Sequence, residues 1–133
     1  METAPSIVQK LAEVLICLPF LASAVSKALD FDGARNELAA LGLPQPHVLA
    51  VAVIGLQFVA PAMILLGIGA WIGTLALAGF TTLATLLAHR WWTMPQGKQA
   101  HHLQVFMEHA AIVGGLLLIA LVDIVGWRGW SRS

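Results

Sequence analysis

The sequence predicts an all-α integral membrane protein, a four-helix bundle with antiparallel, up-and-down topology. Hydrophobic residues make up 59% of the 133-residue chain and charged residues only 11%, whereas soluble domains average about 25% charged residues. A soluble domain of this length cannot bury so much apolar surface. The apolar runs are also long, rich in Ala and Leu, and without the alternation of strands. We therefore expect residues 1–133 to form a single transmembrane domain.

Each predicted span meets the length of about 20 mostly apolar residues that a bilayer requires. The four spans are residues 7–29, 47–67, 71–90 and 105–126. The first is expected to remain as a helix, because Glu13 lies near its start and no basic leader of a signal peptide precedes it.

The connections between the spans are polar or rich in glycine. The first, DFDGARNELAALGLPQP (30–46), contains charged residues and two prolines, and we expect a short interfacial helix over residues 34–41. The second, GIGAW (67–71), is a tight link, and the third is RWWTMPQGKQAHH (90–102). With four spans, both termini and the tight link share one side of the membrane, and the other two connections share the opposite side.

Tryptophans support the positions of the membrane surfaces, since Trp prefers the headgroup level. Trp71 and Trp91 flank the third span and lie 20 residues apart, which is about 30 Å of helix, the thickness of the hydrocarbon core. Basic residues are balanced between the two sides. We expect the termini to be cytoplasmic, because a short basic tail follows the fourth span.

Ionisable side chains gather at the ends of the spans that face the two longer connections. Antiparallel packing is expected to bring them to one rim, where they face the interior and pair with each other. The residues are Lys27, Asp30, His47, His89, Glu108 and His109. Histidine titrates near neutral pH and Lys–Asp pairs can relay protons. The candidate proton-handling residues are therefore Lys27, Asp30, His89 and His109.

Helical spacing also predicts which polar side chains share a buried face. Thr74, Thr81, Thr85 and His89 fall on one stripe of the third span. Gln57 lies in the middle of the second span and needs a polar partner. The candidate cofactor-binding residues are Gln57, Thr85, His89, Glu108 and His109.

Other polar residues have a structural interpretation. We expect Lys10 and Glu13 to form an ion pair near the membrane surface and Asp123 to reach Arg128 or water. The lone cysteine, Cys17, is expected to be a small buried apolar residue, since one thiol cannot form an internal disulfide. His101 and His102 are interpreted as surface residues.

Several segments, in order along the chain, resemble the DoxX family of small four-helix bacterial membrane proteins. The first span ends in FLASAVSKALDF (20–31), where the family has a pattern like FLxSGxxKLxDF, and ALGLPQP (40–46) matches its turn. The matching segments of the second, third and fourth spans are APAMILLG (60–67), ATLLAH (84–89) and FMEHAAIVGGLLLI (106–119). The chain departs from the family at Ala24, where Gly is usual, at Gln57, where an acidic residue is common, and at Glu108 and His109, which replace Lys-Asn.

The resemblance implies a redox-linked role in the bacterial inner membrane. Some members of the family are small subunits of a thiosulfate:quinone oxidoreductase, and others are linked to membrane oxidoreductase complexes in oxidative-stress defence. It thus implies a quinone-handling subunit with a soluble or membrane-bound redox partner.

Two other hypotheses stay open beside the quinone-linked one. The chain is alternatively a non-enzymatic assembly partner, scaffold or small-solute pathway in the bilayer, with or without self-association. A third alternative is haem bound by His89 and His109, or zinc or copper bound by His101, His102, Glu108 and His109. However, HHLQVFMEH (101–109) has no recognised ligand spacing, so no residue is assigned as a metal ligand. The net charge of zero gives no indication of nucleic-acid binding.

Overall fold

The computed structural model describes residues 3–126, and among these residues it contains helices and no strand. The predicted all-α membrane architecture is confirmed, because four helical segments are long and apolar enough to cross a bilayer: Ile7–Leu29, Pro46–Leu66, Ala70–Thr93 and Gln96–Ile124. The α-helices are α1 (Thr3–Leu29), α2 (Phe31–Ala40), α3 (Pro46–Leu66), α4 (Ala70–Ala88) and α5 (Gln96–Leu121). A 3-10 turn, Trp91–Thr93, follows α4, and a π-helical turn, Val122–Gly126, follows α5.

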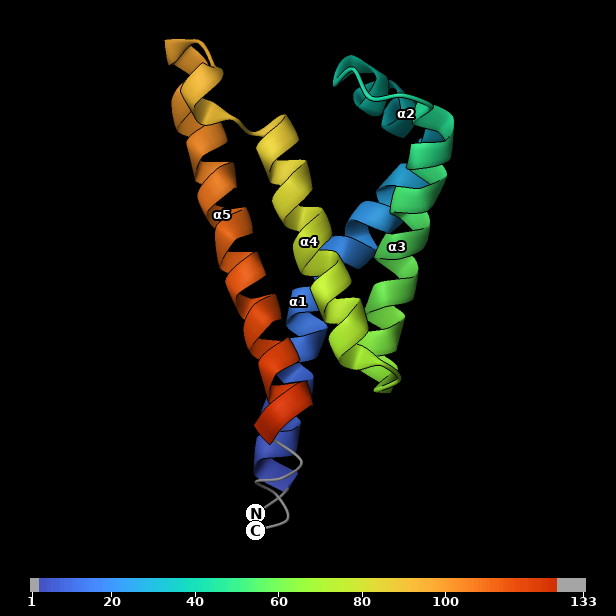
Figure 1. The fold of residues 1–133 in the computed structure, drawn as a ribbon, viewed down its shortest axis with the longest axis vertical. Coiled ribbons are helices and arrows are strands. Elements are labelled where there is room, and N and C mark those ends of the chain that lie inside the picture. The colour runs from blue at the N-terminus through green and yellow to red at the C-terminus, as the bar shows by residue number, and fades with distance from the viewer. Residues whose placement is uncertain (1–2, 127–133) are drawn as a thin grey trace.

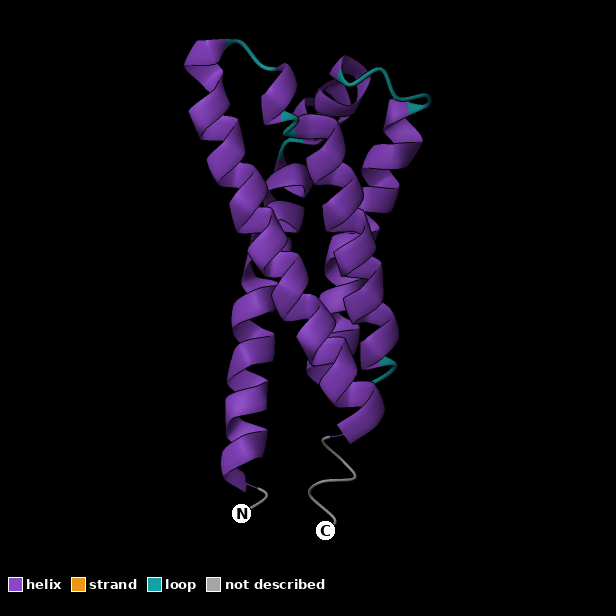
Figure 2. Ribbon diagram, turned by 60° about the vertical axis from the view of Figure 1, so that its left-hand side comes forward, coloured by secondary structure: helices purple, strands orange, loops and turns teal. Residues whose placement is uncertain are grey.

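The long helices alternate in direction, and α4 lies between α3 and α5 while α1 packs mainly against α3 (Figure 1). The first turns of α1, the last turns of α5 and the α3–α4 link lie at one end of the bundle, which we call the terminal side. The short helix α2 and the α4–α5 connection lie at the opposite end, the loop side (Figure 2). This is the predicted arrangement of the connections.

Two helices begin earlier than the sequence predicts. α2 begins at Phe31 rather than at residue 34, because the Asp30 carboxylate accepts a hydrogen bond from the Gly33 N–H at 3.1 Å and caps the helix. α5 begins at Gln96 rather than at residue 105. Gln96, Lys98, Gln99 and Ala100 are good helix formers, and together they outweigh Gly97, so the helix extends beyond the apolar segment. His101 and His102 therefore lie in a helix and not in a loop.

The core is small and lies where α1, α3, α4 and α5 meet. Its buried members are Cys17, Phe20, Ala60, Ile64, Leu77, Ala78 and Leu116. Cys17 is completely buried, as the sequence predicts. Many larger side chains, among them Leu18 and Leu118, are more than half exposed on the outer surface. Lipid is the environment that stabilises such a surface.

Glycines bring α3 and α4 close together. Gly67 and Gly69 have positive φ angles of 71° and 59° and form the tight link between the two helices, a conformation that side chains other than glycine rarely adopt. One turn into α4, a Cβ atom at Gly73 would lie 2.9 Å from the Ala60 carbonyl oxygen and 3.3 Å from Met63 Cβ. The helices are therefore too close at this point for any side chain on residue 73.

Gly73→Ala should destabilise the bundle, because the added methyl group forces α3 and α4 apart. We expect the free energy of unfolding in detergent to fall by about 1–3 kcal/mol. The matched control is Gly79→Ala in the same helix, where a Cβ atom meets nothing within 4 Å; it should leave stability unchanged or raise it by up to about 1 kcal/mol. Equal unfolding curves for the two variants would contradict the close contact.

Candidate functional site

A cavity of about 360 Å³ opens between α2, α3 and α4 on the loop side; we call it the loop-side cavity. Its walls are mostly aliphatic, with Leu38, Val53, Phe80 and Leu87 among them. Its ionisable lining residues are Lys27, Glu37, His89 and His109. A largely apolar cavity with a few convergent polar groups is the usual form of a small-molecule site.

Three of the four predicted proton-handling residues line this one cavity. Lys27 is in the last turn of α1, His89 follows the last residue of α4, and His109 is in the first half of α5. Residues up to 82 positions apart in the chain are thus brought together by the antiparallel packing. Their chemical role stays a prediction.

His109 is held in one orientation by Thr85 of α4. The His109 Nδ1 atom lies 2.9 Å from the Thr85 hydroxyl, and that hydroxyl donates to the Thr81 carbonyl oxygen at 2.6 Å. Because a hydroxyl has one proton and it goes to the carbonyl, the oxygen accepts from His109 Nδ1–H. A neutral His109 then carries its lone pair on Nε2, the ring nitrogen left for a ligand.

His89 is at the centre of a group of histidine rings. Its Nδ1 atom lies 3.1 Å from His102 Nδ1, and its ring meets the ring of His109 edge to face with centroids 5.5 Å apart. His102 is half-buried, so its interpretation as a surface residue is wrong. In the sequence, the indication of this contact is that His102 lies seven residues before His109. The two share one helix face because α5 begins at Gln96. His101 is exposed, as expected.

Lys27 and Asp30 do not form the predicted pair. Lys27 Nζ donates to Ser23 Oγ one turn earlier in α1, at 2.6 Å, whereas the Asp30 carboxylate caps α2 through Gly33. Neither residue is in an ion pair among the described residues. Lys27 therefore lines the cavity without an acidic partner, and Asp30 has a structural role at the start of α2.

The remaining predicted residues lie outside the cavity. Glu108 is exposed on α5 and accepts a hydrogen bond from Gln104 Nε2 at 3.3 Å. His47 is exposed at the start of α3, with its ring edge against Phe31. Gln57 is buried in the middle of α3, as predicted, but it does not line the loop-side cavity.

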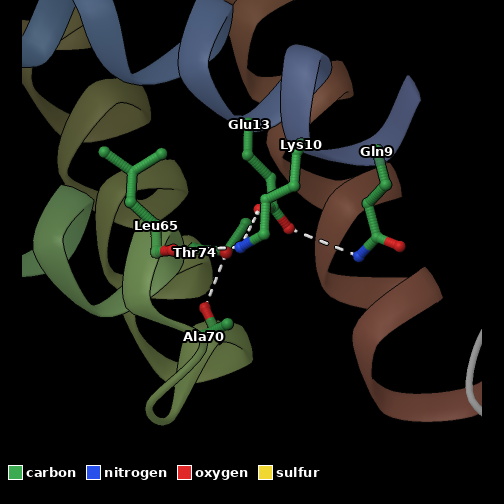
Figure 3. Close-up of polar contacts among 6 residues, drawn as sticks. All are labelled: Gln9, Lys10, Glu13, Leu65, Ala70 and Thr74. Atoms are coloured by element: carbon green, nitrogen blue, oxygen red, sulfur yellow. Dashed lines mark hydrogen bonds and ion pairs between the residues drawn. The ribbon is translucent and has the colours of Figure 1, made fainter. Parts of the chain in front are cut away.

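A second polar cluster, which the sequence only partly indicates, lies toward the terminal side. The expected ion pair is present, since Lys10 Nζ lies 3.1 Å from Glu13 Oε1. Lys10 also donates to the Leu65 carbonyl oxygen of α3 at 2.9 Å, and Gln9 Nε2 donates to Glu13 Oε2 at 3.3 Å (Figure 3). The Glu13 side chain is only 5% exposed, however.

The burial of Glu13 follows from the periodicity of α1. Over residues 7–29 of that helix the buried residues are Glu13, Cys17, Phe20 and Ala24. They follow Glu13 at spacings of four, seven and eleven, which define one helix face. Because Glu13 lies one turn before the buried Cys17 on the same face, its carboxylate is inside the bundle and not at the membrane surface.

Asp123 has a different partner from the one expected. Its carboxylate accepts a hydrogen bond from the Trp71 backbone N–H, in the first turn of α4, at 3.2 Å. A carboxylate at a helix N-terminus satisfies a free N–H group and complements the helix dipole. Arg128, the expected partner, lies outside the described residues.

Within residues 3–126, no group of three or more His, Cys, Asp or Glu side chains has an arrangement that could hold a metal ion.

Comparison with known proteins places these features in a family. Residues 11–90 match the model of the family described as DoxX. The chain is also 30% identical over 113 residues to the inner membrane protein YphA of Escherichia coli (strain K12), covering 84% of this chain and 79% of that protein. No solved structure matches significantly.

Thr85→Val should change the tautomer of neutral His109. Valine has nearly the same shape as threonine but removes the oxygen that accepts from Nδ1–H, so the proton is expected to move to Nε2, the usual site for a free imidazole. Nitrogen NMR of histidine-labelled protein distinguishes the two forms. Thr82→Val is the control, because the Thr82 hydroxyl donates to the Ala78 carbonyl oxygen in the same way but accepts no hydrogen bond from a histidine. An Nε2–H signal for His109 in the unmodified protein would contradict the assignment.

Proposed function

This chain belongs to the DoxX family, and from that membership together with the loop-side cavity we propose that it is a quinone-binding subunit of a membrane oxidoreductase system. The observation that carries the proposal is the meeting of Lys27, His89 and His109, from three helices, in one mostly apolar cavity. The family resemblance described above adds the redox-linked context.

The cavity has the size and access that a lipid-soluble ligand requires. Its volume of about 360 Å³ falls within the range of small-molecule sites. One of its lining residues, Leu83, is 60% exposed on the outside of α4, so the cavity reaches the surface that faces lipid. A quinone ring can enter from the bilayer at this point, while its isoprenoid tail stays among the aliphatic side chains.

The polar lining residues fit the carbonyl oxygens of a quinone ring. Lys27 Nζ has three protons and gives one to Ser23, so it has donors left for a ligand carbonyl. His109, fixed by Thr85, offers Nε2 as the acceptor of a hydroxyl proton from the reduced form. His89 supports the ring of His109 from the side. A bound quinone would supply the two-electron chemistry.

The proposed cellular location is the bacterial inner membrane, because the relative YphA is named as an inner membrane protein. We propose that the termini face the cytoplasm and that electrons come from a separate redox partner, soluble or membrane-bound. The proposed role of this chain is to hold the quinone and to exchange its protons.

A non-catalytic scaffold is the second candidate, and the positions of two predicted site residues favour it. Asp30 caps a helix and Glu108 is exposed away from the cavity, which are roles in structure rather than in chemistry. On this alternative the cavity holds lipid, and no quinone preference is expected.

His109→Gln should weaken the binding of a short-chain quinone analogue. Removing a ring nitrogen that bonds the ligand costs about 0.5–1.5 kcal/mol, which corresponds to a dissociation constant raised about 2- to 12-fold. The dissociation constant is measured by titrating the purified protein in lipid nanodiscs. The matched control is His101→Gln, an exposed histidine on the same helix, which should bind as tightly as the unmodified protein.

Leu83→Trp provides a steric version of the same test, since a larger side chain at the lipid-facing edge obstructs the cavity. It should weaken quinone binding at least as much as His109→Gln. If the unmodified protein does not bind the analogue, or if all three variants bind equally, the quinone proposal is wrong and the scaffold alternative is favoured.

A further inference from the structure

Three buried polar atoms in the bundle interior have no hydrogen-bond partner among the described residues. They are Glu13 Oε1, Gln57 Oε1 and Thr81 Oγ1; the 3.1 Å contact of Glu13 Oε1 with Lys10 is an ion pair without hydrogen-bond alignment. The three residues are only 4%, 4% and 5% exposed. In a bilayer, where no bulk water is available, unpaired groups are costly, and bound internal water usually satisfies them.

The three residues come from three helices and lie at successive depths. The close approach of Gly73 to Ala60 sets the register of α3 against α4. Gln57 precedes Ala60 by three residues in a helix of opposite direction, so it lies at a depth between Thr74 and Thr81. Lys10 bonds the Leu65 carbonyl, which sets the register of α1 against α3. Glu13 follows Lys10 by three residues, so it lies at a depth between Leu65 and Gln57.

The steps along this series are short. With a rise of about 1.5 Å per residue, Glu13 to Gln57 and Gln57 to Thr81 are each about 7–8 Å along the bundle axis, and Thr81 to Thr85 is about 6 Å. Internal water that bridges these polar groups is part of the proposal. All four residues, Glu13, Gln57, Thr81 and Thr85, are buried.

Each end of the series reaches a region open to exchange. On the loop side, the Thr85 hydroxyl lies 2.9 Å from His109 Nδ1, and His109 lines the loop-side cavity. Toward the terminal side, the Glu13 carboxylate contacts Lys10, whose side chain is 54% exposed. In Figure 3 the Glu13 carboxylate points away from the α1 backbone, and dashed lines join its oxygens to Lys10 and Gln9.

We propose that Glu13, Gln57, Thr81, Thr85 and His109 form a proton-transfer path, completed by internal water, between the terminal side of the membrane and the loop-side cavity. This path goes beyond the proposed quinone site, since its conduction does not require a bound quinone. If the path carries the protons that a bound quinone takes up or releases, that role rests on the proposed function.

The hydrogen-bond directions show how one proton passes through. A proton bound at His109 Nε2 makes the ring cationic, and the Nδ1 proton then moves to the Thr85 oxygen. The Thr85 hydroxyl releases its hydrogen bond to the Thr81 carbonyl oxygen and gives its own proton to water beside Thr81. One proton enters and one leaves, so the ring is neutral again with its proton on Nε2, and proton exchange through water in the cavity returns it to the Nδ1–H form. Water held by Gln57 carries the proton to the Glu13 carboxylate, which releases it beside Lys10.

Few other ionisable groups face Glu13. On α1 its neighbours are Lys10, in contact, and the Cys17 thiol one turn away. Residues 48–66 of α3 and residues 70–88 of α4 contain no ionisable side chain. In the last turns of the α5 segment the one ionisable residue described is Asp123, and its carboxylate accepts from the Trp71 N–H. Glu13 is therefore the one acidic group placed to exchange protons within the interior of the described bundle.

The test is proton flux into vesicles that contain the purified protein and a pH-sensitive dye, driven by a potassium diffusion potential with valinomycin and without quinone. The unmodified protein should carry protons at least about threefold faster than protein-free vesicles. Thr81→Val, which removes one hydroxyl at nearly constant shape, should return the flux to the protein-free level, and Thr81→Ser should restore it. Thr82→Val, at the adjacent position with its hydroxyl on a backbone carbonyl, should conduct normally.

Glu13→Gln should abolish the flux as well, and the Thr81 variants keep the test decisive if this variant folds poorly. Absence of flux above protein-free vesicles, or equal flux in Thr81→Val and Thr82→Val, overturns the path. Quinone binding in nanodiscs separates the two proposals: binding that is normal in Thr81→Val while its flux is lost supports both, and absent binding with normal flux in the unmodified protein rejects only the quinone site.

Discussion

The structure depends on one constraint: inside a bilayer, polar groups must find partners within the protein. The chain responds to it by burying polar side chains of the spans, such as Gln57, Thr74 and Thr85, and by exposing Leu, Ile and Val to lipid. The threonines of α4 illustrate this. Thr74 and Thr85 are buried and donate to carbonyl oxygens one turn earlier at 2.6 Å. Their hydroxyl oxygens stay available as acceptors, which is how Thr85 holds His109.

α4 is the element through which this constraint becomes a site. It packs against α3 on one side and α5 on the other, so its buried face meets polar residues from both. The close approach at Gly73 sets its distance from α3 on the terminal side. The Thr85–His109 contact joins it to α5 on the loop side. From Gly73 toward the loop side, α3 and α4 diverge toward α2 (Figure 1), and the loop-side cavity lies in the space between them.

Hydropathy and helical spacing determine the spans and their order, so these follow from the sequence. The same holds for the rim of the bundle at which Lys27, His89 and His109 gather. Contacts between side chains do not follow in the same way. Asp30 caps α2 instead of pairing with Lys27, since a cap satisfies a free N–H group within the same segment. His102 joins His89 because α5 extends beyond its apolar part. Such outcomes depend on where helices begin, which hydropathy does not indicate.

His109 connects the two polar regions of the bundle because its two ring nitrogens face different surroundings. Nδ1 is bonded to Thr85, within the buried face of α4, and the ring lines the cavity shared with Lys27. A glutamine or lysine at this position would also supply a polar group, but neither passes a proton from one side of the ring to the other. An imidazole gains a proton at one nitrogen and loses one at the other. In the proposed path, this property is the reason for a histidine at a position where the chain departs from the pattern of the family it resembles.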